Sequence, residues 1–212
     1  MRMDEISFFP NTGDGTHCYQ AALKMVLSCF DPKEWSYEEL NQISDKQKGK
    51  WTWPTASFLW LLNQGYEVRL IEEFDYSDFA KRGYEYLLEK SGKEIAEGQA
   101  ANSDLASEQG WAKKLAAHPK FQQEHRIPLW QDLDHLLAED YGLICNVNAC
   151  KLYDKPGYSA HFVVPMAVTS THILLHDPGL PPKPDQRVLH KPFEKAWGYP
   201  TDHEKNLVAI GR

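Results

Sequence analysis

The segment Gly15-Thr16-His17-Cys18-Tyr19-Gln20-Ala21-Ala22-Leu23-Lys24-Met25-Val26-Leu27 decides the predicted fold. It follows an opening stretch rich in turn-forming residues, including Pro10, Asn11 and two glycines. Its apolar residues recur at three- and four-residue steps, which predicts a helix with one buried face. The helix should begin at about Cys18, with Thr16 as its N-cap. A thiol in this position lies in the positive potential of the helix N-terminus, which favours the thiolate.

Cys18 is therefore a candidate nucleophile. On a helical wheel it shares a face with Ala22, Met25 and Cys29, so its side chain should point toward the body of the protein. A thiolate in that orientation is placed to meet a base supplied by another part of the chain. The alternative is that Cys18 is a small buried residue of the core.

A β-hairpin that contains a histidine and an aspartate is predicted near the C-terminus. One strand follows His161, a turn occurs at Thr169-Ser170-Thr171, and the return strand ends at Asp177. If the turn centres on Thr169, His161 and Asp177 lie directly opposite each other and project from the same face, whereas a one-residue slip separates them. A carboxylate beside an imidazole orients the ring and stabilises its cation. Alternatively, His161 is a strand-end residue and Asp177 a turn former before Pro178-Gly179.

Three segments resemble those of the C39-like cysteine peptidases. The segment at 15–27 resembles their nucleophile helix, and Gly157-Tyr158-Ser159-Ala160-His161-Phe162-Val163-Val164 with His176-Asp177-Pro178-Gly179 resembles their His and Asp segments. Phe193-Glu194-Lys195-Ala196-Trp197 is similar to their closing helix. The resemblance implies a papain-like α+β fold, with an N-terminal nucleophile helix and a C-terminal antiparallel sheet. It also implies a Cys18-His161-Asp177 acyl-transfer site that acts on peptide or amide bonds.

The chain departs from that family around the nucleophile. Relatives commonly have Asp-Cys-Gly where this chain has His17-Cys18-Tyr19, and they carry a Gln about six residues before the Cys, whose amide stabilises the oxyanion. Here Asn11 lies seven residues before Cys18 and Thr12 six before. We expect Asn11 to be the oxyanion donor, together with the backbone N–H of Cys18, and Thr12 is the alternative.

The rest of the chain is predicted to form one domain, 1–212, with helices early and strands late, which indicates an α+β protein. The predicted elements are a helix at 55–64, a strand at 67–71, a polar helical insertion at about 74–123, a helix at 129–140, a strand at 143–147 and a stiff surface loop at 181–184. The segment Trp51-Thr52-Trp53-Pro54 belongs either to the core or to an aromatic wall of a substrate groove.

Composition excludes several classes of function. A net charge of −7 without a basic run argues against nucleic acid as the partner. The sequence has no leader-like segment and no apolar run that approaches a membrane span, so we expect a cytoplasmic protein with four free thiols. Cys145 and Cys150 with His172 or His176 lack the spacing of a zinc site, so neither metal nor other cofactor is predicted.

These observations favour a thiol hydrolase that cleaves a peptide, amide or isopeptide bond through a thioester intermediate. The expected partner is a peptide or an amide-bearing substrate. Two alternatives remain at this point. One is an acyl transferase in which an amine replaces water, and the other is a non-catalytic binding module that retains the fold. The oligomeric state does not follow from the sequence.

Overall fold

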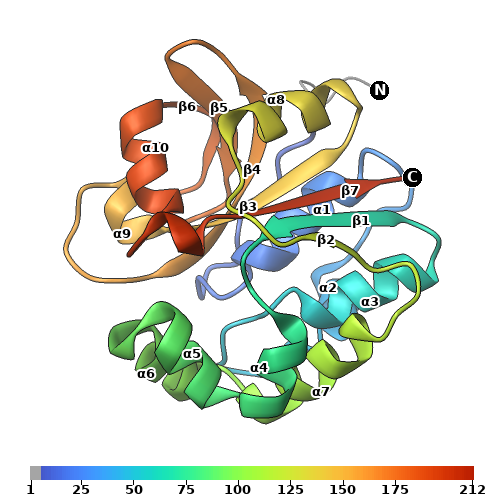
Figure 1. Ribbon diagram of the computed structural model, residues 1–212. Coiled ribbons are helices and arrows are strands. Elements are labelled where there is room, and N and C mark those ends of the chain that lie inside the picture. Colours follow the sequence, from blue (N-terminus) through green and yellow to red (C-terminus); the bar gives the residue numbers. More distant parts are fainter. Residues whose placement is uncertain (1–5) are drawn as a thin grey trace.

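A mixed seven-stranded sheet runs through the centre of the protein (Figure 1). The computed structural model describes residues 6–212. The strand order is β2-β1-β7-β3-β4-β5-β6, in which β2 is parallel to β1 and all other neighbours are antiparallel. The strands are β1 Glu67–Glu72, β2 Gln122–Glu124, β3 Gly142–Asn148, β4 Ala160–Val168, β5 His172–Asp177, β6 Lys183–Leu189 and β7 Asn206–Gly211.

Helices cover both faces of this sheet, so the predicted α+β class is confirmed (Figure 1). Strand β1 lies in the first half of the chain and pairs with β7, the C-terminal strand. The helices are α1 Cys18–Leu27, α2 Tyr37–Ile43, α3 Thr55–Asn63, α4 Tyr76–Arg82, α5 Tyr84–Ser91, α6 Lys93–Asn102, α7 Leu105–Ala116, α8 Trp130–Ala138, α9 Ala149–Leu152 and α10 His190–Trp197. The predicted helix at 129–140 and strands at 67–71 and 143–147 are confirmed to within about two residues at each end.

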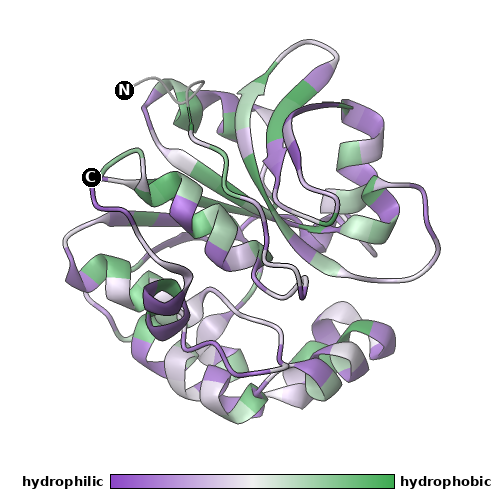
Figure 2. Ribbon diagram, turned by 180° about the vertical axis from the view of Figure 1, so that it is seen from behind, coloured by the Kyte–Doolittle hydropathy of each residue, from purple (hydrophilic) through white to green (hydrophobic). Residues whose placement is uncertain are grey.

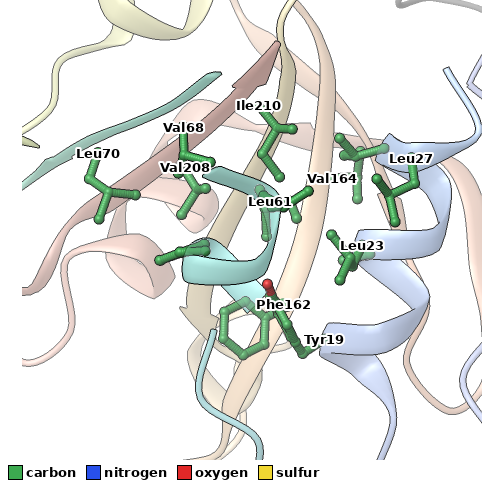
Figure 3. Packing of buried hydrophobic residues seen from close by; sticks show 14 of the residues in the cluster. Tyr19, Leu23, Leu27, Leu61, Val68, Leu70, Phe162, Val164, Val208 and Ile210 are labelled. Carbon is green, nitrogen blue, oxygen red and sulfur yellow. The ribbon is translucent and has the colours of Figure 1, made fainter. Parts of the chain in front are cut away.

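The central strands β1, β7, β3, β4 and β5 are apolar on both faces, which gives two hydrophobic clusters. On β4, Phe162 and Val164 pack with α1 and α3, whereas Val163 between them packs with α8 and α10. Figure 3 shows Leu23 and Leu27 of α1 beside Val164 in the first cluster. Figure 2 shows hydrophobic residues along the central strands and a mixture of residues on the surrounding helices. Burying one such aliphatic side chain stabilises the fold by about 1.5–3 kcal/mol.

Helix α1 begins at Cys18 as predicted, but the predicted N-cap is wrong. His17 occupies the N-cap position and its side chain makes no capping bond. The Thr16 hydroxyl instead donates to the Asp14 carboxylate at 3.1 Å, because this acceptor lies two residues away in the same turn. The Asn11 Oδ1 atom accepts from the backbone N–H of His17 at 2.7 Å, so a residue outside the helix stabilises its first turn.

The polar insertion forms α4 to α7 followed by β2. Asp75 and Asp104 begin α4 and α7 with carboxylates that accept backbone N–H bonds, which explains why a polar sequence forms stable helices here. Gly83 joins α4 to α5 with a φ of 52°, and a Cβ there would lie 2.6 Å from the Gln109 side chain. The apolar side of the insertion packs in the same cluster as α1, and β2 extends the sheet beside β1.

The expected proline loop at 181–184 is only partly correct. Pro184 lies inside β6, which pairs with β5 through Asp177 and Lys183. A proline is tolerated in this strand because β6 is at the edge of the sheet, where one side has no ladder partner. The chain therefore returns to the sheet sooner than its proline content indicates.

Candidate active site

The structure brings Cys18 and His161 together at the end of the sheet. Cys18 is the first residue of α1 and is partly buried, whereas His161 is the second residue of β4 and is 7 % exposed. Burial opposes ionisation of the Cys18 thiol more than any other single influence. The hydrogen bond from His161, the charge of its ring and the N–H groups of Phe162 and Tyr19 nevertheless lower the pKa of the thiol.

Asp177 contacts the other side of the imidazole. Its Oδ1 atom lies 2.5 Å from Nε2 of His161, which leaves Nδ1 for the thiol. Although burial opposes both ionisations, the bonds to Asp177 and Cys18 raise the pKa of His161 to about 10, and His161 lowers the pKa of Asp177. These shifts favour a thiolate and an imidazolium at neutral pH, with a buried carboxylate behind the ring.

The predicted register of the hairpin is wrong, although the two side chains do meet. The ladder between β4 and β5 pairs Val168 with Ile173, Ala167 with Leu174, Pro165 with Leu175 and Val164 with His176. Continued by one residue, it places Asp177 opposite Val163, so that His161 is a diagonal neighbour on the same face. The extra residue is Met166, which forms a β-bulge. Without this bulge, Asp177 would fall opposite Val164 and project from the other face.

Sequence reasoning missed two further groups around Asp177. The Tyr153 hydroxyl donates to Asp177 Oδ2, and the Gly179 N–H donates to Oδ1 at 2.7 Å. A Cβ at Gly179 would lie 2.8 Å from that oxygen and 3.3 Å from the His161 ring, so this position requires glycine. The Pro178-Gly179 turn is visible in the sequence, whereas nothing in the sequence connects Tyr153 with a residue 24 positions away.

Asn11 lies in the loop before α1 and is buried. Its Oδ1 accepts from the backbone N–H groups of Thr12 and His17, and its own N–H donates to the Pro178 carbonyl at 2.8 Å. Nδ2 of Asn11 has no acceptor among residues 6–212, whereas the Thr12 hydroxyl contacts Asp14 and His17, each at 2.6 Å. Neither Asn11 nor Thr12 lines the cavity that contains Cys18. The oxyanion role of Asn11 stays a prediction.

A cavity of about 280 Å³ opens beside the nucleophile, and Cys18 and His161 both line it. Part of its wall comes from the insertion, which contributes Leu87 of α5 and Ile95 of α6. The insertion whose role could not be predicted therefore shapes the space next to the thiol. The aromatic residues of the lining are Tyr19, Trp51, Trp53, Phe58, Phe74, Tyr76, Tyr158, Phe162, Trp197 and Tyr199.

The remaining cysteines occupy different surroundings. Burial raises the pKa of the Cys29 thiol to about 11 and that of Cys145 still further. Within residues 6–212, no group of three or more His, Cys, Asp or Glu side chains is arranged to hold a metal ion. The structure thus does not assemble the alternative set of Cys145, Cys150, His172 and His176, and His176 instead contacts the Ile6 carbonyl at 2.9 Å.

Comparison with known proteins adds no relative. No protein-family model matches the chain, and no curated protein is significantly similar to it. Across residues 6–212, every helix is too short or too polar to cross a bilayer. The geometry around Cys18 is therefore the observation that supports a function.

Proposed function

We propose that the protein is a thiol hydrolase of the papain-like, C39-like kind, which cleaves a peptide, amide or isopeptide bond. The observation that carries this proposal is the buried chain of contacts from Asp177 through His161 to Cys18. A helix that presents a thiol to an antiparallel sheet with a histidine and an aspartate is the arrangement expected for such enzymes. The lowered thiol pKa and the raised imidazole pKa fit a nucleophile that is ionised before the substrate arrives.

In the first half of the proposed reaction, the Cys18 thiolate attacks the carbonyl carbon of the scissile bond. The carbonyl oxygen becomes an oxyanion, for which the backbone N–H of Cys18 and Nδ2 of Asn11 are the proposed donors. When this intermediate collapses, the carbon–nitrogen bond breaks and the His161 imidazolium gives its proton to the leaving amine. The acyl group is then held as a thioester on Cys18.

In the second half, a water molecule attacks the thioester. Neutral His161 takes a proton from the water, and Asp177 stabilises the imidazolium that forms. The carbon–sulfur bond breaks, the acid product leaves, and the thiolate–imidazolium pair is restored. Asp177 keeps its hydrogen bonds to Tyr153 and Gly179 throughout, which holds the ring in one orientation.

Alkylation of the folded protein with iodoacetamide tests the proposal. We expect Cys18 to react near neutral pH well ahead of Cys29, Cys145 and Cys150, as followed by mass spectrometry of the individual peptides. Hydrolysis of the activated ester p-nitrophenyl acetate should disappear in the Cys18→Ser variant. Equal alkylation rates at all four thiols would contradict the proposal.

Two matched variants test the oxyanion donor with the same ester. Asn11→Ala should lower turnover by about two to three orders of magnitude with little change in KM, because the bond strengthens only as the carbonyl becomes tetrahedral. Thr12→Ala should stay near the wild-type rate, since its hydroxyl already contacts Asp14 and His17. Near-normal turnover of the Asn11 variant beside a collapse of the Thr12 variant would assign the role to Thr12.

A further inference from the structure

The cavity extends from the nucleophile across four neighbouring strands to a carboxyl group. Glu72 of β1 pairs with Asn206 of β7, and Asn146 of β3 pairs with Phe162 of β4. The Asn206 side chain joins the two pairs by bonding the backbone N–H and C=O of Asn146 at 2.7 and 3.1 Å. Because adjacent strands lie about 4.8 Å apart, Glu72 is about 14 Å from Phe162, whose N–H contacts the Cys18 thiol.

Glu72 is the carboxyl group of this lining that has no basic partner. Its Oε1 atom accepts from the Tyr76 hydroxyl at 2.8 Å, and no ion pair within residues 6–212 includes it. The other two carboxylates of the lining each have a basic partner, namely Glu73 with His203 at 2.5 Å and Glu204 with Lys90 at 3.2 Å. Burial raises the pKa of Glu72 to about 7, although the hydrogen bond from Tyr76 and the charge of Lys90, which pairs with Glu204, oppose the shift.

Aromatic rings line the cavity that holds both Glu72 and the thiol. Trp51, Trp53, Phe74 and Tyr158 all line the cavity, and Phe74 and Trp53 lie edge to face with centroids 5.9 Å apart. Aromatic faces attract ammonium and guanidinium groups, and they also cover the alkyl chains that carry such groups. A cavity with aromatic walls and one carboxyl group outside any ion pair is complementary to a ligand that carries a cation at the end of an alkyl chain.

We propose that Glu72 binds an ammonium or guanidinium group of the substrate, at about three strand spacings from the bond that Cys18 attacks. The substrate class is then a cationic peptide or amide. This proposal rests on the proposed thiol hydrolase function, and it adds a specificity-determining residue at the far end of the same cavity. The cation belongs either to the acyl part or to the leaving amine, since both would lie in the cavity during the reaction.

Alkylating probes of graded length test this geometry. Each probe is an iodoacetamide whose nitrogen carries an alkyl spacer, either ethyl or decyl, ending in an ammonium or in a methyl group. The Cys18 thiolate displaces iodide and forms a carbon–sulfur bond in every case. With the decyl spacer, the ammonium probe should label Cys18 at least about tenfold faster than its methyl twin, because a charged hydrogen bond forms at Glu72. With the ethyl spacer, the two probes should react equally.

Two carboxyl variants on the same strand provide the control. Glu72→Gln should reduce the ammonium advantage of the decyl probe to about one. Glu67→Gln should retain the advantage, because Glu67 also accepts from a tyrosine hydroxyl, that of Tyr141, but lies outside the cavity. The rate with plain iodoacetamide shows that Cys18 of each variant is still ionised and the site intact.

The outcomes separate the two proposals. Selective labelling of Cys18 by plain iodoacetamide without any ammonium advantage at the decyl length would overturn the role of Glu72 and leave the hydrolase proposal standing. An advantage that persists in Glu72→Gln would also overturn it. Loss of selective labelling by plain iodoacetamide would overturn the hydrolase proposal, and the assignment of Glu72 with it. To place the cation, 1,10-diaminodecane is added with p-nitrophenyl acetate, so that one amine can attack the acetyl thioester on Cys18 while the other, as an ammonium, reaches Glu72. Acetyl transfer to this diamine that exceeds transfer to decylamine, and that loses this excess in Glu72→Gln, assigns the cation to the leaving amine, and absence of the excess assigns the cation to the acyl part.

Discussion

Cys18 and Cys145 are two thiols on neighbouring elements, and their pKa values shift in opposite directions. Cys145 lies in β3, is fully buried and pairs with Val163, only two residues from His161 along β4. Burial there raises the pKa of the thiol, and no other group opposes it. At Cys18 burial is again the largest influence, yet the hydrogen bond and charge of His161 reverse the direction. A contact with the imidazole therefore decides the direction in which the pKa of the thiol moves, and burial or mere proximity does not.

Removal of the imidazole should have the largest effect on the difference in alkylation rate between Cys18 and Cys145. In His161→Gln, the pKa of the Cys18 thiol should rise toward that of a buried thiol such as Cys145, and its alkylation at pH 7 should slow by about 100-fold. Iodoacetamide rates measured between pH 5 and 10 on each peptide would show the titration moving to higher pH. His135→Gln is the control, because His135 is exposed and distant in the fold. An unchanged titration would show that His161 does not govern the thiol.

A weaker change is expected when only the carboxylate is altered. Asp177→Asn keeps the shape of the side chain but removes the negative charge 2.5 Å from the imidazole. Because the imidazolium is then less stable, the thiolate beside it is less favoured, and alkylation of Cys18 should slow by about tenfold. Asp185→Asn removes a carboxylate next to His176 instead and should have no effect. Equal rates for the two variants would contradict the role of Asp177.

The coupled pair also predicts the pH dependence of stability. In the unfolded chain the imidazole titrates near 6.5 and the thiol near 9.0, whereas in the folded protein the thiol titrates lower and the imidazole at about 10. Just below pH 9.0 the pair holds one proton in both states, on the thiol in the unfolded chain and on the imidazole in the folded protein, so its contribution stays level there. Above pH 9.0 the unfolded pair loses that proton while His161 keeps it, and the free energy of unfolding should fall by up to about 1.4 kcal/mol over the next pH unit.

A variant without the thiol checks that the level region comes from the coupled pair. Urea unfolding from pH 5 to 10 measures this profile. In Cys18→Ser the level region should disappear, because Asp177 still raises the imidazole pKa and stability then declines from pH 6.5 upward. The same level region in both proteins would exclude a coupled pair.

The smallest expected effect on the thiol concerns Tyr153. In Tyr153→Phe the buried Oδ2 atom of Asp177 loses its donor, which should lower the free energy of unfolding by about 1 kcal/mol. The alkylation rate of Cys18 should change by less than about threefold, because Asp177 retains its bonds to His161 and Gly179. Urea unfolding and peptide alkylation check the two parts. Tyr199→Phe removes a hydroxyl that contacts exposed Glu94 and should leave both unchanged.

Much of the fold follows from local patterns. The apolar steps after Cys18 predict α1, and the apolar runs around 143–147 and 161–177 predict β3, β4 and β5, because burial of one helix face or of alternate strand residues is a local requirement. The residue types of the site are also evident, since a thiol at a helix start and an aspartate before Pro178-Gly179 are visible in order along the chain.

The assembly of the site depends on tertiary structure. One unpaired residue, Met166, restores the parity that places His161 and Asp177 on a common face, and no local pattern reveals a bulge whose position is set by packing on both faces of β4. Tyr153, which directly follows α9, reaches Asp177. Glu72 shares a cavity with Cys18 only because β1, β7, β3 and β4 are neighbours in the sheet. The sequence by itself determined the candidate residues Cys18, His161 and Asp177 of the proposed chemistry, because their residue types and local patterns are visible along the chain. Only the tertiary structure decided which of them meet, because hydrogen bonds between distant segments depend on register and strand order.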